Sequence, residues 1–72
     1  TFAHLAQTNF TAAILREANL TFADARRANF TLADLTRANL REARLQGAKL
    51  NDADLTDAKL HGATMPDGSR HA

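Results

Sequence analysis

The stretch REANLTFADARRANFTLADL, residues 16–35, repeats a pattern of five residues that decides the fold. Alanine begins each unit, and a larger apolar residue usually stands two places later, at a position that we call the centre. The pattern continues outward in both directions without an insertion, and Thr8 is the one unit start that is not alanine. The thirteen consecutive units of residues 1–65 have the centres Leu5, Phe10, Leu15, Leu20, Ala25, Phe30, Leu35, Leu40, Leu45, Leu50, Leu55, Leu60 and Met65.

Neither regular backbone explains a period of five. On an α-helix, five residues advance about 140° beyond a full turn, so the centres would point to every side. In a β-strand, side chains alternate between two faces, so centres five apart would alternate as well. A chain that bends once per unit keeps every centre on one side and coils around an apolar axis, with neighbouring coils about 4.8 Å apart. Residue propensity alone would favour a helix, but the period persists over the whole repeat region and outweighs it.

The units ANLTF, ADARR, ANFTL, ADLTR and ANLRE resemble the A(D/N)LXX motif of pentapeptide-repeat proteins. The resemblance covers residues 1–65 and implies an all-β fold, a right-handed quadrilateral β-helix with four units per coil and about three coils. Residues 66–72 are expected to form a C-terminal turn and tail. There Pro66 and the Asp67-Gly68 pair would end the repeats and cover part of the last open edge.

A coil of twenty residues predicts which side chains lie above one another. The inner stacks are Phe10–Phe30–Leu50, Leu15–Leu35–Leu55, Leu20–Leu40–Leu60 and Leu5–Ala25–Leu45–Met65. Ala25 departs from the motif and leaves room that Phe10 and Phe30 on the adjoining side can fill. If they leave a void, Ala25→Leu should stabilise the fold. The outward positions predict polar ladders, among them Glu17–Arg37–Asp57.

The sequence offers no catalytic or metal-binding constellation. It has 72 residues, a formal net charge of +1 and no cysteine. The only serine, Ser69, lies in the tail, and a stacked pair of Asp34 and Asp54 would face solvent on a convex surface without a pocket. The histidines are spread along the coil and tail: His4, His61 and His71. We therefore expect no enzyme activity, no metal or other cofactor and no small-molecule substrate.

The distribution of charge and the way in which the chain begins limit the remaining classes of function. The mixed charges predict no nucleic-acid binding, and no apolar run is long enough to span a membrane. Because the chain starts in mid-repeat without Met, we expect a piece of a larger protein, for which a cytoplasmic location is favoured. Its first coil then either follows further coils or associates edge to edge with a copy of itself.

Exposed apolar residues are the remaining functional signal. Phe2, Phe22, Ile14 and Leu32 occupy outward or corner positions, and they form either a candidate protein-binding patch or simple padding of the corners. We expect a non-enzymatic structural or protein-interaction module with an unknown partner. The resemblance implies a C-terminal repeat domain of a larger, kinase-linked or other signalling protein. The alternative that it implies is a DNA-mimicking protein that interacts with gyrase, which the near-neutral charge and the small number of coils disfavour.

Overall fold

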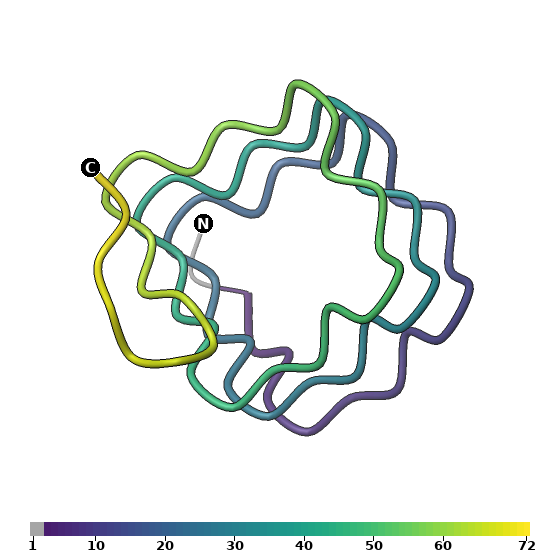
Figure 1. Cartoon of the computed structure of the whole chain (residues 1–72), viewed down its shortest axis with the longest axis horizontal. Helices are drawn as coiled ribbons and strands as arrows, with labels where there is room; N and C mark the ends of the chain where they lie inside the picture. Colours follow the sequence, from purple (N-terminus) through teal and green to yellow (C-terminus); the bar gives the residue numbers. More distant parts are fainter. Residues whose placement is uncertain (1–2) are drawn as a thin grey trace.

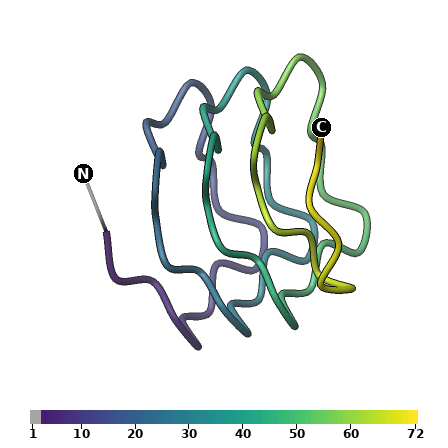
Figure 2. The same cartoon turned by 90° about the vertical axis from the view of Figure 1, so that its left-hand side faces the viewer.

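The chain winds repeatedly around a single axis (Figure 1). The structure is a computed structural model, and it describes residues 3–72. Parallel β-bridges join each outward residue to the one twenty positions later, from His4↔Asp24 to Arg44↔Thr64. Four units of five residues therefore form one coil, as the family resemblance implies, and Figure 2 shows the coils side by side along the axis.

The β-pairing differs from a regular sheet. Within residues 3–72 no helix forms and no strand exceeds a single residue, since pairing is confined to isolated bridges at every fifth position from 4 to 64 and at residue 70. The bridges still belong to a dense ladder of backbone hydrogen bonds. The Leu20 amide donates to the Asn39 carbonyl of the next coil at 2.8 Å, and the Asn39 amide donates back to the Ala18 carbonyl at 2.9 Å. These hydrogen bonds join each coil to its neighbours.

A sharp corner after each centre explains why the extended stretches stay short. The amide of Ala23 donates to the Leu20 carbonyl at 3.0 Å, which closes a β-turn. The second corner residue has a positive φ, between 57 and 62° wherever it is not glycine. An L-residue in this left-handed region costs about 1 kcal/mol. The residues concerned are Gln7, Ala12, Glu17, Phe22, Arg27, Leu32, Arg37, Glu42, Asp52 and Asp57, with Gly47 and Gly62 in the same place.

The core follows the axis and is most completely shielded from solvent in the middle of the molecule. Ala25, Phe30, Leu35, Leu40 and Leu45 are each 1% exposed. The rings of Phe10 and Phe30 stack with centroids 5.2 Å apart and planes inclined by 6°, which confirms that predicted stack. The stabilising effect of Ala25→Leu stays a prediction. The centres nearer the two ends are only partly buried, because a neighbouring coil covers them on one side alone. They are Leu5, Phe10, Leu15, Leu20, Leu50, Leu55, Leu60 and Met65.

The tail turns back onto the last coil. After Pro66 the chain reverses, and Thr64 and Arg70 form an antiparallel bridge. The Met65 amide donates to the Ser69 carbonyl at 2.6 Å, and the His71 amide donates to the Ala63 carbonyl at 2.7 Å. The tail, yellow in Figures 1 and 2, therefore lies along one side of the last coil.

Candidate functional site

Outward Asn and Asp side chains close the corners of the coil. Asn29 Oδ1 accepts hydrogen bonds from the Thr31 amide at 3.0 Å and from the Thr31 hydroxyl at 2.6 Å. Such an Asx turn satisfies a corner amide that makes no bond to a neighbouring coil. The arrangement recurs at Asn9–Thr11, Asn19–Thr21, Asp34–Thr36, Asp54–Thr56 and Asp67–Ser69.

The stacked carboxylates of Asp34 and Asp54 also accept hydrogen bonds that close corners of the coil. The two residues lie side by side on neighbouring coils. Hydrogen bonds from Thr36, and then from Arg16, lower the pKa of Asp34 to about 2. Hydrogen bonds from Thr56 lower the pKa of Asp54 as well. Carboxylates that stay ionised near neutral pH are poor general acids. We therefore interpret this pair as support for the coil rather than as reactive groups.

The structure divides the predicted apolar patch into separate surfaces. Ile14, Phe22 and Leu32 are the large apolar side chains exposed within residues 3–72, at 79%, 49% and 57% respectively. Leu32 lies above Ala12, two positions before Ile14, so that Leu32 and Ile14 make one surface on neighbouring coils; we call it the Ile14–Leu32 surface. Phe22 lies half a coil away at the opposite corner. Phe2 lies outside the described residues.

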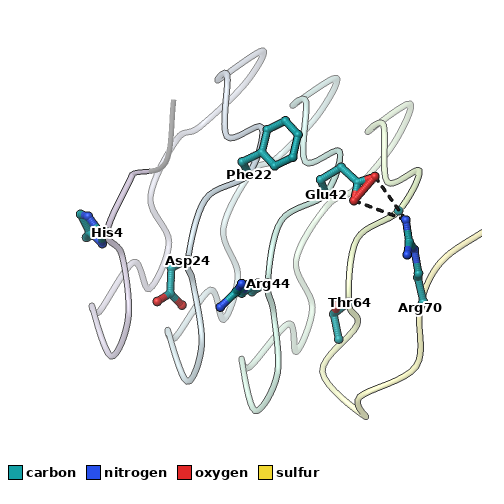
Figure 3. Close-up of a pocket in the computed structure, with 8 residues that line it drawn as sticks. His4, Phe22, Asp24, Glu42, Arg44, Thr64 and Arg70 are labelled. Atoms are coloured by element: carbon teal, nitrogen blue, oxygen red, sulfur yellow. Dashed lines mark hydrogen bonds and ion pairs between the residues drawn. The ribbon is translucent and has the colours of Figure 1, made fainter.

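A shallow groove of about 460 Å³ lies where the tail returns to the coil (Figure 3). We call it the tail groove. Bridges place its outward residues on successive strands, with Thr64 between Arg44 and Arg70. The sequence did not predict this groove, because Arg70 reaches it only where the tail turns back. Its lining residues are His4, Phe22, Asp24, Glu42, Arg44, Gly62, Thr64 and Arg70.

The charged side chains of the tail groove differ in how closely they are bound to an oppositely charged partner. Arg26 holds both oxygens of the Asp24 carboxylate, at 2.8 and 2.7 Å, and lowers the pKa of Asp24 to about 2. Arg70 Nη2 donates to the two Glu42 oxygens at the longer distances of 3.3 and 3.5 Å. Arg44 makes no side-chain hydrogen bond or ion pair with any residue of 3–72, and it acts on Asp24 only at longer range.

Gly62 makes room for the Glu42 side chain. A Cβ atom added to Gly62 would lie 2.5 Å from Glu42 Oε1 and 2.6 Å from Glu42 Cδ. The carboxylate can therefore lie flat over the glycine and reach Arg70, which ties the last corner of the coil to the tail.

Neither metal ligands nor a membrane-spanning segment emerge from the described part of the chain. Within residues 3–72, no three or more His, Asp or Glu side chains are placed to hold one metal ion. The same residues include no helix with the length and apolar character needed to cross a bilayer. His4 lines the tail groove, whereas His71 Nδ1 lies 2.9 Å from the Ala72 carbonyl oxygen in the tail.

Comparison with known proteins places this geometry among repeat proteins. The sequence pattern of pentapeptide repeats matches residues 1–31 and 33–67, in eight copies. The chain is 41% identical to HetL, a pentapeptide repeat protein involved in heterocyst differentiation regulation in the cyanobacterium Nostoc sp. strain PCC 7120. That alignment has a TM-score of 0.68 and covers 94% of this chain and 33% of HetL.

Two further solved structures agree with the first. A pentapeptide repeat protein from the cyanobacterium Cyanothece 51142 is 39% identical, with a TM-score of 0.77 over 78% of this chain and 38% of the other. One from the thylakoid lumen of Arabidopsis thaliana is 32% identical, with a TM-score of 0.72 over 88% and 54%. The chain thus spans from a third to about half of the length of these structures. No curated protein sequence matches it.

Proposed function

Because this chain belongs to the pentapeptide-repeat family, we propose that it is a non-enzymatic structural or protein-interaction module within a larger, signalling-linked protein. The proposal includes the finer geometry that the family implies, a right-handed quadrilateral β-helix. HetL is involved in the regulation of differentiation. A regulatory role through protein contacts is consistent with this chain, in which the stacked carboxylates of Asp34 and Asp54 close corners of the coil. The near-neutral charge of +1 does not favour a DNA mimic.

The Ile14–Leu32 surface is the observation that carries this proposal. Leu32 is 57% exposed and adopts a φ of 62°, so its side chain gains little burial at a position that disfavours any L-residue. Ile14 is 79% exposed, although the equivalent residues of the same ladder are Asp34 and Asp54. Neighbouring exposed apolar side chains on a repeat surface are typical of a protein contact.

A pull-down with matched variants tests this function. We expect the double variant Ile14→Asp and Leu32→Asp to lose at least one partner that the unmodified chain recovers, because charges disrupt an apolar contact. Phe22→Asp, at the opposite corner, is the control and should retain the same partner. Far-ultraviolet circular dichroism would verify that both variants keep the fold. Equal recovery by the unmodified chain and the double variant would contradict the proposed surface.

A further inference from the structure

The tail groove has more hydrogen-bond donors than its own acceptors can engage. A guanidinium group carries five N–H donors. Arg44 uses none of them on another side chain within residues 3–72, and Arg70 uses only Nη2, on Glu42. The carboxylate of Asp24 is already held at both oxygens by Arg26. The groove is therefore suited to a ligand that brings several acceptor oxygens.

The donors lie on three successive strands. Arg44 pairs with Thr64, and Thr64 pairs with Arg70, so the three residues stand in a row on the outer face. With strands about 4.8 Å apart, the backbones of the two arginines are about 10 Å from one another, with the Thr64 hydroxyl between them. Long arginine side chains can close over this span onto a single anion. A tetrahedral phosphate offers oxygens to all three donors, whereas a planar carboxylate offers only two.

Glu42 already shows that an anionic group can occupy the groove. Its carboxylate reaches Arg70, but at 3.3 and 3.5 Å, longer than the 2.7–2.9 Å typical of charge-assisted hydrogen bonds. Both side chains are also partly exposed, at 70% for Arg70 and 35% for Glu42, which weakens their attraction. Glu42 is thus a weakly held internal competitor that a doubly charged anion can displace.

Arg44 must change its direction to take part. In Figure 3 its side chain extends toward Asp24, away from Thr64. The gain from that position is small, because Arg26 already binds Asp24 at both carboxylate oxygens. Arg26 balances the charge of Asp24. The two positive charges of Arg44 and Arg70 then exceed the one negative charge of Glu42, so that the groove has one net positive charge.

We propose that the tail groove binds a phosphate monoester between Arg44, Thr64 and Arg70, with Glu42 as the internal carboxylate that the phosphate displaces. This site is distinct from the Ile14–Leu32 surface and does not depend on the proposed function. The expectation of no small-molecule substrate did not anticipate it, because the tail supplies one of the two arginines.

The test is a titration of the 72-residue chain with O-phosphoserine at low ionic strength, in which two-dimensional NMR monitors the backbone amides. We expect the largest shifts at the amides of Thr64 and Arg70. Arg44→Gln and Arg70→Gln should each weaken binding by about tenfold, which corresponds to about 1.4 kcal/mol. Glu42→Gln should strengthen binding severalfold, because it removes the competing carboxylate and one negative charge.

Lys49→Gln is the matched control, since it removes one positive charge from the next side of the coil. The proposal requires Lys49→Gln to bind within about twofold of the unmodified chain, a difference below about 0.5 kcal/mol. A loss equal to that of Arg44→Gln would show general charge attraction and overturn the site. Unchanged or weaker binding by Glu42→Gln would overturn it too. Amide spectra that keep their dispersion would show that each variant is folded.

Further ligands identify the chemistry and its source. Free glutamate should bind at least tenfold more weakly than O-phosphoserine, and equal binding would refute the preference for phosphate. Inorganic phosphate and a phosphoserine peptide then separate two sources of the same group. Tighter binding of the peptide would support a phosphorylated protein as the ligand, whereas equal binding would support a free phosphate. Failure of both ligands to bind would contradict the proposal.

Discussion

The middle coil, residues 23–42, and the coils on either side share the repeat pattern but differ in how deeply their centres are buried. Leu20, Leu40 and Leu60 occupy one inner stack, yet only Leu40 is 1% exposed, and the other two are partly buried. The amides of Leu20 and Leu40 both donate to the next coil at 2.8 Å. The Leu60 amide has no backbone acceptor within residues 3–72. Burial here is a property of having a coil on each side, so the stability resides at the interfaces between coils.

Truncation of the leucines in this stack should give the largest difference in stability between the middle coil and an outer coil. Leu40→Ala should reduce the free energy of unfolding by about 2–4 kcal/mol, because it leaves a cavity among buried neighbours. Leu60→Ala should cost about 1 kcal/mol, because the side chain is partly exposed already and the last coil can adjust. Denaturant titrations followed by circular dichroism measure both. Equal losses for the two variants would show that the outer coil is as well packed as the middle coil.

The corners give a second comparison, with a smaller effect. Leu32→Val should cost about 1–2 kcal/mol, because a β-branched residue tolerates a positive φ poorly. Asp52→Val, at the same corner of the outer coil, should cost at least as much, because Asp tolerates a positive φ better than Leu does. Leu32→Gly should be close to neutral, because glycine relieves strain but also gives freedom to the unfolded chain. Thermal unfolding of the three variants would test this order, and a harmless Leu32→Val would contradict the corner strain.

The positive φ of the corner was readable from the sequence but was not predicted. The second corner position never holds Val, Ile or Thr, the residues that fit a left-handed backbone worst. The first corner position, by contrast, holds Thr in five units, each two residues after an Asn or Asp. That spacing is the signature of the Asx turns. The period of five predicted a coil with its centres facing inward. The inner stacks also required four units per coil, a number that only the family resemblance implied.

Two features of the candidate sites were not predicted, for different reasons. Phe22 and Leu32 are ten residues apart, which places them half a coil apart, and a count along the coil would have separated them in advance. The tail groove is different in kind. The sequence marks a turn at Pro66, but only the folded chain shows that Arg70 returns beside Thr64 and that Glu42 lies over Gly62.

Acid should act differently on the middle coil and on the tail, and this is the smallest effect that we predict. The pKa of Asp34 falls from 3.8 to about 2, chiefly through Thr36 and then Arg16, so its contribution to stability is present above about pH 4 and is lost as the pH falls toward 2. Asp34→Asn should flatten the decline of the melting temperature over that range, since Asn29 shows that an amide can accept the same bonds. Asp67→Asn, in the tail, should flatten it less, because opening the tail leaves the middle coil covered. A larger effect of Asp67→Asn than of Asp34→Asn would mean that acid unfolding begins at the tail and that the coils do not set the melting temperature.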